Sequence, residues 1–146
     1  ESVGGKNSQW GIDNAKKLVN PHKPDIVYIG FGMNDMTMPG NILKEKFVQI
    51  INNIREEYPD CEFIIVATMI PNTEIYGENI VHKEFPKYLA EIENEMKGVA
   101  LINMEEIHEY MLTKKRYMDM TGNNINHPND FLARVYAQTL VKTLSE

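Results

Sequence analysis

Short apolar runs alternate along this chain with longer segments in which apolar and polar residues are mixed. Two of the runs, residues 25–32 and 61–68, are too short for a typical helix and are rich in β-branched and aromatic side chains. This composition predicts strands that are buried on both faces. A shorter apolar run at residues 99–103 predicts a third strand.

The segments between these runs show the spacing of amphipathic helices. In residues 41–58 the apolar side chains recur every three or four positions, while Lys, Glu and Asn occupy the opposite face. Pro59 is expected to end this helix. Residues 69–83 are predicted to form a long loop, and loops of this length are often functional. Further helices are predicted at residues 10–19, 84–97, 104–112 and 130–144.

The alternation of strands and helices predicts the fold class. Strands that are separated by helices form βαβ units, which give a mostly parallel sheet covered by helices on both faces. We therefore expect an α/β fold, a three-layer α/β/α arrangement with a flavodoxin-like parallel sheet. The length of 146 residues suits one domain that spans residues 1–146.

Charge and composition exclude some classes of function. The chain has 15 Lys and Arg against 21 Asp and Glu, a net charge of −6, which argues against nucleic acid as the main partner. No apolar run approaches the roughly 20 residues that a membrane span needs. The single Cys61 cannot form an internal disulfide, so it gives no information about redox compartment, and the cellular location stays unassigned.

Candidate chemistry gathers where the predicted strands end. In open α/β sheets, ligands bind beyond the carboxyl ends of the strands. Gly32-Met33-Asn34-Asp35 follows the first strand, and a second polar segment, which contains His127, precedes the last helix. A Gly4-Gly5 pair lies near the start. Each segment also has an ordinary explanation alone. Asn34-Asp35 could cap a turn, His127 could be a loop histidine without a special role, and Gly4-Gly5 could be a flexible terminus. Together they are more specific, because all are expected on one side of one sheet.

The ordered set of segments resembles the SGNH (GDSL-type) hydrolase family, in particular its carbohydrate-esterase-like members. Gly32-Met33-Asn34-Asp35 is similar to the family's Gly-x-Asn-Asp block, and Gly4 to Ser8 to its oxyanion-hole glycine block. Asn124 to Pro128 is similar to its Asp-x-x-His block. The resemblance covers the whole chain. It implies a serine-dependent esterase or acylhydrolase that acts on a small acyl ester, such as an acetyl group on a carbohydrate, with no metal and no organic cofactor.

The resemblance also implies roles for individual residues. His127 is expected as the general base, and Gly5 and Asn34 as the oxyanion hole. The residue types suit these roles, since an imidazole can accept a proton near neutral pH and Asn34 offers a side-chain N–H. Gly5 has no side chain to keep its backbone N–H from a substrate. Asp35 is interpreted as structural, holding the loop that aims Asn34.

The sequence departs from the family pattern first at the nucleophile. The family's Gly-Asp-Ser block should precede Gly4, and nothing in the chain supplies it. Ser2 has no strand or turn around it, and Ser8 is interpreted as a local hydrogen-bonding or helix-capping residue. We therefore expect the nucleophilic serine upstream, this chain to be the C-terminal portion of the domain without its first strand, and the fragment alone to be inactive. Strand 25–31 should then have an unpaired apolar edge that favours self-association.

The second departure is Asn124, which stands where the family has its triad acid. Asparagine can orient an imidazole but cannot stabilise an imidazolium ion as a carboxylate does. Three alternatives follow: a Ser–His dyad assisted by a carbonyl group, a substitute acid such as Asp119 or Asp130, or a weakly catalytic site. Asp130 is more easily explained as a cap of the last helix.

Other interpretations compete with the hydrolase. A non-catalytic SGNH-like module that binds a glycan or a protein partner would explain Asn124 as lost chemistry. A flavodoxin-like binding domain fits less well, because Gly-Met-Asn-Asp is poorly suited to phosphate or ribose. Glu105-x-x-His108 has the spacing of di-metal helical bundles, but it occurs once and on a short predicted helix, so no metal site is predicted.

Overall fold

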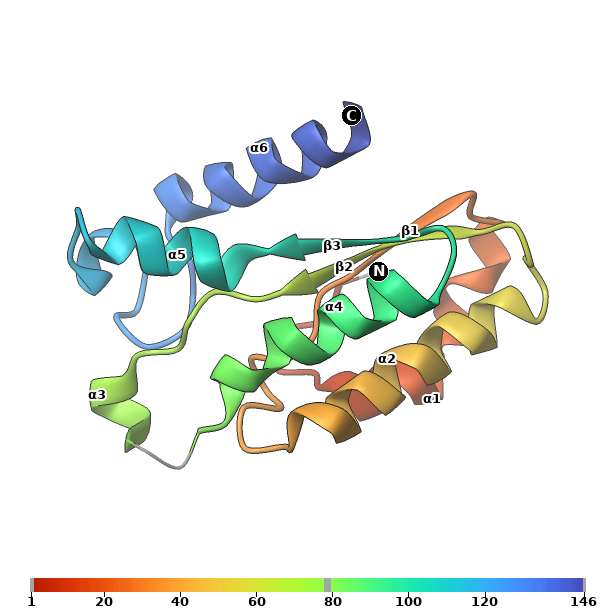
Figure 1. Cartoon of the computed structure of the whole chain (residues 1–146), viewed down its shortest axis with the longest axis horizontal. Helices are drawn as coiled ribbons and strands as arrows, with labels where there is room; N and C mark the ends of the chain where they lie inside the picture. Colours follow the sequence, from red (N-terminus) through yellow and green to blue (C-terminus); the bar gives the residue numbers. More distant parts are fainter. Residues whose placement is uncertain (1, 78–79, 146) are drawn as a thin grey trace.

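The sheet is parallel and lies in the middle of the molecule. The computed structural model describes residues 2–77 and 80–145. Within them, β1 (Ile26–Ile29), β2 (Glu62–Ala67) and β3 (Val99–Asn103) form a parallel sheet in the order β1-β2-β3 (Figure 1). The helices are α1 (Ser8–Leu18), α2 (Gly40–Arg55), α3 (Thr73–Tyr76), α4 (Phe85–Glu95), α5 (Met104–Leu112) and α6 (Asp130–Ser145), with 3₁₀ turns η1 (Asn20–His22), η3 (His82–Glu84) and η4 (Tyr117–Asp119).

Helices cover the two faces of the sheet in separate groups. On one face, α1, α2 and α4 bury a core that includes Phe47, Phe63 and Leu89 (Figure 1). On the other face, α5 and α6 pack against Ile64 and Ile102. The expected three-layer α/β/α fold is therefore confirmed.

The strand β1 is less buried than the sequence predicts. Ile26 and Tyr28 are 45% and 46% exposed, so the prediction that this strand is buried on both faces is wrong. Both side chains lie on the sheet face that α5 and α6 cover, but these helices pack over β2 and β3. In addition, β1 stands at the edge of the sheet, and its outer side pairs with no strand among the described residues.

The element boundaries follow the sequence closely in the second half of the chain. β3 and α5 begin and end at the predicted residues, whereas α2 ends at Arg55, three residues before the predicted end. The predicted long loop at residues 69–83 is partly helical, since α3 and the start of η3 lie within it, and residues 78–79 of that loop lie outside the described residues. None of the described helices is long and apolar enough to cross a membrane.

Candidate active site

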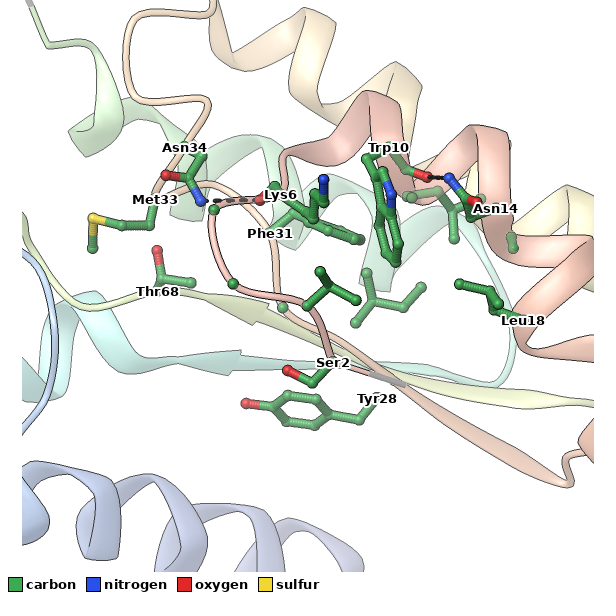
Figure 2. A pocket seen from close by; sticks show the side chains of 18 of the residues that line it. Ser2, Lys6, Trp10, Asn14, Leu18, Tyr28, Phe31, Met33, Asn34 and Thr68 are labelled. Carbon is green, nitrogen blue, oxygen red and sulfur yellow. Dashed lines mark hydrogen bonds between the residues drawn. The ribbon is translucent and has the colours of Figure 1, made fainter.

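A cleft of about 620 Å³ runs along α1 and the open edge of β1 and reaches the residues that follow β1 and β2. Its lining includes three of the predicted site residues, Gly5, Asn34 and His127, which come from segments far apart in the chain. Trp10 and other side chains of α1 form one wall of the cleft (Figure 2). Asn124, the fourth predicted residue, does not belong to the lining.

The loop that carries Asn34 is fixed by a buried carboxylate. Asp35 is 3% exposed and accepts hydrogen bonds from Ser8 N at 3.0 and 3.2 Å and from Ser8 Oγ at 2.7 Å. Ser8 itself has no exposed surface. These contacts support the structural interpretation of Asp35 and tie the first turn of α1 to the loop after β1.

The amide group of Asn34 faces the cleft with one hydrogen bond already made. Its Nδ2 donates to the carbonyl oxygen of Lys6 at 3.0 Å (Figure 2). An amide nitrogen has two hydrogens, so one N–H is available to a ligand without breaking this contact. The bond also joins the Asn34 loop to the segment that carries Gly5.

Gly5 has a backbone conformation that favours glycine. Its φ is +72°, in the left-handed region, whereas a Cβ at this position would meet nothing within 4 Å. The requirement for glycine therefore comes from the turn rather than from lack of space. The open space beside Gly5 leaves room for a ligand to approach its backbone.

His127 lies in an exposed loop whose backbone is well fixed. The Oδ1 atom of Asn123 accepts hydrogen bonds from the backbone N–H groups of Ile125, Asn126 and His127 at 2.9, 3.0 and 3.1 Å. The His127 imidazole makes no hydrogen bond or ion pair with another residue in the described part of the chain. The loop thus holds the backbone of this histidine and leaves its ring available.

None of the candidate acids reaches His127. Asn124 is exposed with φ at 56°, and its backbone oxygen, rather than its side chain, is engaged by Asn72 Nδ2 at 2.8 Å. Asp119 accepts two hydrogen bonds from the Arg116 guanidinium group, at 2.8 and 3.0 Å, and one from its backbone N–H at 3.2 Å, which together lower the pKa of this carboxyl group. The structure therefore shows no acid partner for His127 among residues 2–77 and 80–145.

The cap of α6 is Asn129, not Asp130 as the sequence suggests. The Oδ1 atom of Asn129 accepts hydrogen bonds from the backbone N–H groups of Phe131 and Leu132 at 3.1 and 3.2 Å. Because Asp130 already lies in the first turn of the helix, its carboxylate comes one residue too late for this role.

Two residues that sequence reasoning missed connect the loop after β2 to the His127 loop. Asn72 is 6% exposed and donates to Asn124, and its own backbone N–H donates to the Ile125 oxygen at 2.9 Å. The single hydroxyl hydrogen of Tyr117 is shared between the carbonyl oxygens of Ile70 and Ile125, which lie 3.0 and 2.8 Å from the hydroxyl oxygen. Burial raises the pKa of Tyr117. No sequence pattern marks either contact, since each joins segments distant in the chain.

A second group of polar side chains, also missed, is buried behind the cleft. The Oγ1 atom of Thr68, a cleft-lining residue, lies 3.0 Å from His82 Nε2. The Nδ1 atom of the same ring is 2.8 Å from Glu105 Oε2, within ion-pair distance, and apart from this contact neither atom has a polar partner in the described structure. His82 has no exposed surface, and Glu105 is 7% exposed.

Glu105 and His108, which are three residues apart in α5, make separate contacts. Glu105 faces His82, whereas His108 Nδ1 accepts a hydrogen bond from the Ile70 backbone N–H at 3.2 Å. Burial lowers the pKa of His108 to about 4, so this ring is neutral near pH 7. No group of three or more His, Cys, Asp or Glu side chains suited to a metal ion occurs within the described residues.

Solved structures share this fold. A two-domain esterase active on acetylated mannans, co-crystallised with mannopentaose, superposes with a TM-score of 0.75 at 19% identity over 98% of this chain and 37% of its own. The lipase/acylhydrolase from Enterococcus faecalis gives 0.76 at 18% identity, over 96% of this chain and 71% of its own. A carbohydrate esterase family 3 structure from Talaromyces cellulolyticus gives 0.68 at 17%, over 96% and 67%. The chain thus spans little more than a third of the first of these proteins.

Sequence comparison identifies the family. A comparison with curated protein sequences gave no match. The model of the GDSL-like lipase/acylhydrolase family, by contrast, matches residues 1–135 and so includes Gly5, Asn34 and His127. The resemblance of the sequence to SGNH hydrolases is confirmed. The match covers most of the chain, and we conclude that the chain belongs to the GDSL-like lipase/acylhydrolase family.

Proposed function

We propose that this chain forms the base and the oxyanion hole of a serine-dependent ester hydrolase. The observation that carries the proposal is that Gly5, Asn34 and His127 line one cleft although they lie in three separate segments. Acyl transfer requires a base near the nucleophile and hydrogen-bond donors aimed at the developing oxyanion. The imidazole of His127, the backbone N–H of Gly5 and the amide of Asn34 are groups of these kinds.

The reaction then proceeds in two steps. The serine hydroxyl attacks the ester carbonyl carbon while His127 takes its proton, and the tetrahedral oxyanion is stabilised by the N–H groups of Gly5 and Asn34. The alcohol leaves with the proton from His127, and an acyl-serine remains. Water, deprotonated by His127, hydrolyses the acyl-serine, so the carboxylic acid is released and the serine is restored.

The nucleophile is proposed to be a serine outside these 146 residues, so that the chain alone is inactive. Ser8 is buried and donates its hydroxyl to Asp35, and the Ser145 hydroxyl is bonded within α6. Ser2 lines the cleft, but it lies in no helix or strand and its hydroxyl contacts no base in the described structure. These environments do not activate any of the three side chains.

An acyl ester on a carbohydrate is the proposed substrate class. The support comes from the sequence resemblance to carbohydrate-esterase-like members and from solved structures of the same fold, one of which is active on acetylated mannans. The part of the cleft beside Asn34 is lined by Trp10, Phe31 and Met33 among polar groups, a mixture that suits an ester with an apolar acyl group.

Fluorophosphonate labelling of the full-length protein that contains this chain, followed by peptide mapping, tests this function. The reagent reacts with an activated serine, so we expect one labelled serine and loss of the label in His127→Ala but not in the control His22→Ala. Asn34→Ala should lower kcat for an acetyl ester by about 10²- to 10³-fold. A label on Ser8 would contradict the assignment of the segments, and an unlabelled, folded protein would contradict the esterase.

A second candidate, a glycan- or protein-binding module without catalysis, is favoured by one observation. His127 has no acid partner in the described structure, and the side chain of Asn124 makes no hydrogen bond to it. Asn124→Asp distinguishes the candidates, because a carboxylate could stabilise the imidazolium ion. A large gain in turnover supports the binding module, whose catalytic activity was lost with the acid. Unchanged turnover in an active protein supports a Ser–His dyad.

A further inference from the structure

Thr68 is the cleft residue whose surroundings the proposed mechanism leaves unexplained. It directly follows β2, and its Oγ1 lies 3.5 Å from the position that a Cβ on Gly32, in the loop after β1, would occupy. Thr68 therefore lies directly beside the loop that carries Asn34, and Figure 2 shows both side chains in the same cleft. Behind it are His82 and Glu105.

The hydrogen-bond direction between Thr68 and His82 depends on the protons of the buried pair. His82 and Glu105 are at least nine-tenths buried, and no Lys or Arg forms an ion pair with Glu105 in the described structure. A lone buried carboxylate is costly, so the pair is most stable when its net charge is zero. Either the imidazolium faces the carboxylate, or a neutral imidazole faces the carboxylic acid.

Both neutral forms of the pair put a proton on the same ring nitrogen. In the ion pair, His82 carries protons on both nitrogens. In the uncharged pair with the acid proton on Oε2, the oxygen that faces the ring, Nδ1 accepts from the carboxylic acid, and the ring proton is on Nε2. In each case Nε2–H donates to Thr68 Oγ1, 3.0 Å away. The hydroxyl hydrogen of Thr68 must then point elsewhere, and the open direction is the cleft.

We propose that Thr68 is a hydrogen-bond donor to an oxygen of the bound ester, next to Asn34, and that His82 and Glu105 hold it in the donor state. This inference rests on the proposed function for the identity of the ligand. His82 and Glu105 are positioning residues, because they act through Thr68 and do not reach the cleft surface.

A rival interpretation makes Thr68 a nucleophile with His82 as its base. A base in acyl transfer must also return the proton to the leaving alcohol. His82 has no exposed surface and lies behind Thr68, so the leaving group cannot reach it. The geometry therefore favours a donor rather than a nucleophile.

Nitrogen NMR of the histidine-labelled chain tests the donor state without any need for catalysis. We expect Nε2 of His82 to carry a proton near pH 7, with the signal assigned by its loss in His82→Gln. An Nε2 without a proton would mean that Thr68 donates inward, and this would overturn the proposal. Glu105→Gln should keep the proton on Nε2, since the glutamine amide can donate to Nδ1.

Binding of triacetin, a small soluble acetyl ester, tests the contact with the ligand. Thr68→Val removes the hydroxyl at nearly constant volume and should weaken binding by about 2- to 10-fold, while Thr68→Ser should keep it. Thr139→Val is the matched control, because that hydroxyl donates to the Val135 oxygen within α6, at 2.9 Å. Equal affinity of wild type and Thr68→Val would overturn the proposal.

Kinetics separate this inference from the hydrolase itself. In the active protein, Thr68→Val should lower kcat by about 10- to 100-fold, because the hydrogen bond strengthens as charge develops on the ester oxygen. Glu105→Ala should lower kcat and Glu105→Gln should restore most of it, since the amide can still donate to His82 Nδ1. A loss in Glu105→Gln as large as in Glu105→Ala would support the nucleophile interpretation instead. Triacetin binding through Thr68 without any hydrolysis by the full-length protein would contradict the proposed function and leave this inference intact.

Discussion

The two halves of the candidate site are held in different ways. On the oxyanion side, the buried carboxylate of Asp35 fixes the loop that carries Asn34 through both the backbone and the hydroxyl of Ser8. On the base side, the exposed His127 loop is held by neutral groups, chiefly the amide of Asn123. Hydrogen bonds to a charged acceptor are stronger than neutral ones. The difference suggests a rigid oxyanion hole that faces a more adjustable base.

Removal of the buried carboxylate should have the largest effect. Asp35→Ala leaves the Ser8 N–H and hydroxyl groups buried without their partner, so we expect a loss of about 3 kcal/mol in the free energy of unfolding. Urea denaturation measures this loss. Asp13→Ala is the control, because Asp13 is exposed and accepts one bond, from Gln9 at 2.9 Å. Equal losses of unfolding free energy in Asp35→Ala and Asp13→Ala would show that the buried carboxylate does not hold the oxyanion side more firmly than an ordinary surface contact.

Acid should weaken the base side through His108. Burial lowers the pKa of His108 to about 4 from 6.5, and its ring accepts from the Ile70 backbone, near the contacts that hold the His127 loop. Between pH 6.5 and about pH 4, His108 is protonated in the unfolded chain but stays neutral in the folded chain. The free energy of unfolding should therefore fall by up to about 3 kcal/mol over this window.

Denaturation at pH 7 and at pH 4.5 checks this acid effect. His108→Gln should be less stable at pH 7 but lose less on acidification than the wild type, because the titrating group is absent. His22→Gln, at an exposed position, should behave as the wild type does. If the free energy of unfolding of His108→Gln falls on acidification as much as that of the wild type, the acid effect comes from other groups.

The smallest expected effect on stability is at Asn123. Asn123→Ala removes a side chain that accepts three backbone hydrogen bonds, but the loop is exposed and water can replace the amide, so about 1 kcal/mol is expected. Faster amide exchange at Ile125 and His127 should accompany it. Asn94→Ala, which removes one exposed bond to Ala90, is the control. Unchanged exchange would show that Asn72 and Tyr117 are sufficient to hold this loop.

The sequence predicted those parts of the fold that local signals determine. β3 and α5 match their predicted bounds, because Gly98 precedes the strand and Asn103, with its side chain, caps the helix that follows. The burial of β1 was overestimated, since the exposure of Ile26 depends on how far α6 extends over the sheet, which no local pattern encodes. The sequence also predicted that Gly5, Asn34 and His127 lie on one side of the sheet, and all three line the cleft, while their catalytic roles stay predictions.

Contacts between distant loops account for most of what the sequence did not predict. The hydrogen bonds of Asn72 and of Thr68 join segments whose approach depends on the finished fold. Asn124 was selected by its place in a motif, but a motif gives a position along the chain and not the direction of a side chain. Its left-handed backbone is visible only in three dimensions.

The open side of β1 should also be visible in time-resolved exchange. Asp25 accepts a bond from the Glu62 N–H, so the backbone groups of Val27 and Ile29 point toward β2, and those of Ile26 and Tyr28 point outward. Deuterium should therefore enter this strand at every second residue, with two amides slow and two fast. A strand added along this edge, from a second copy or another segment, would slow the two fast amides and convert the alternating pattern into a uniform one.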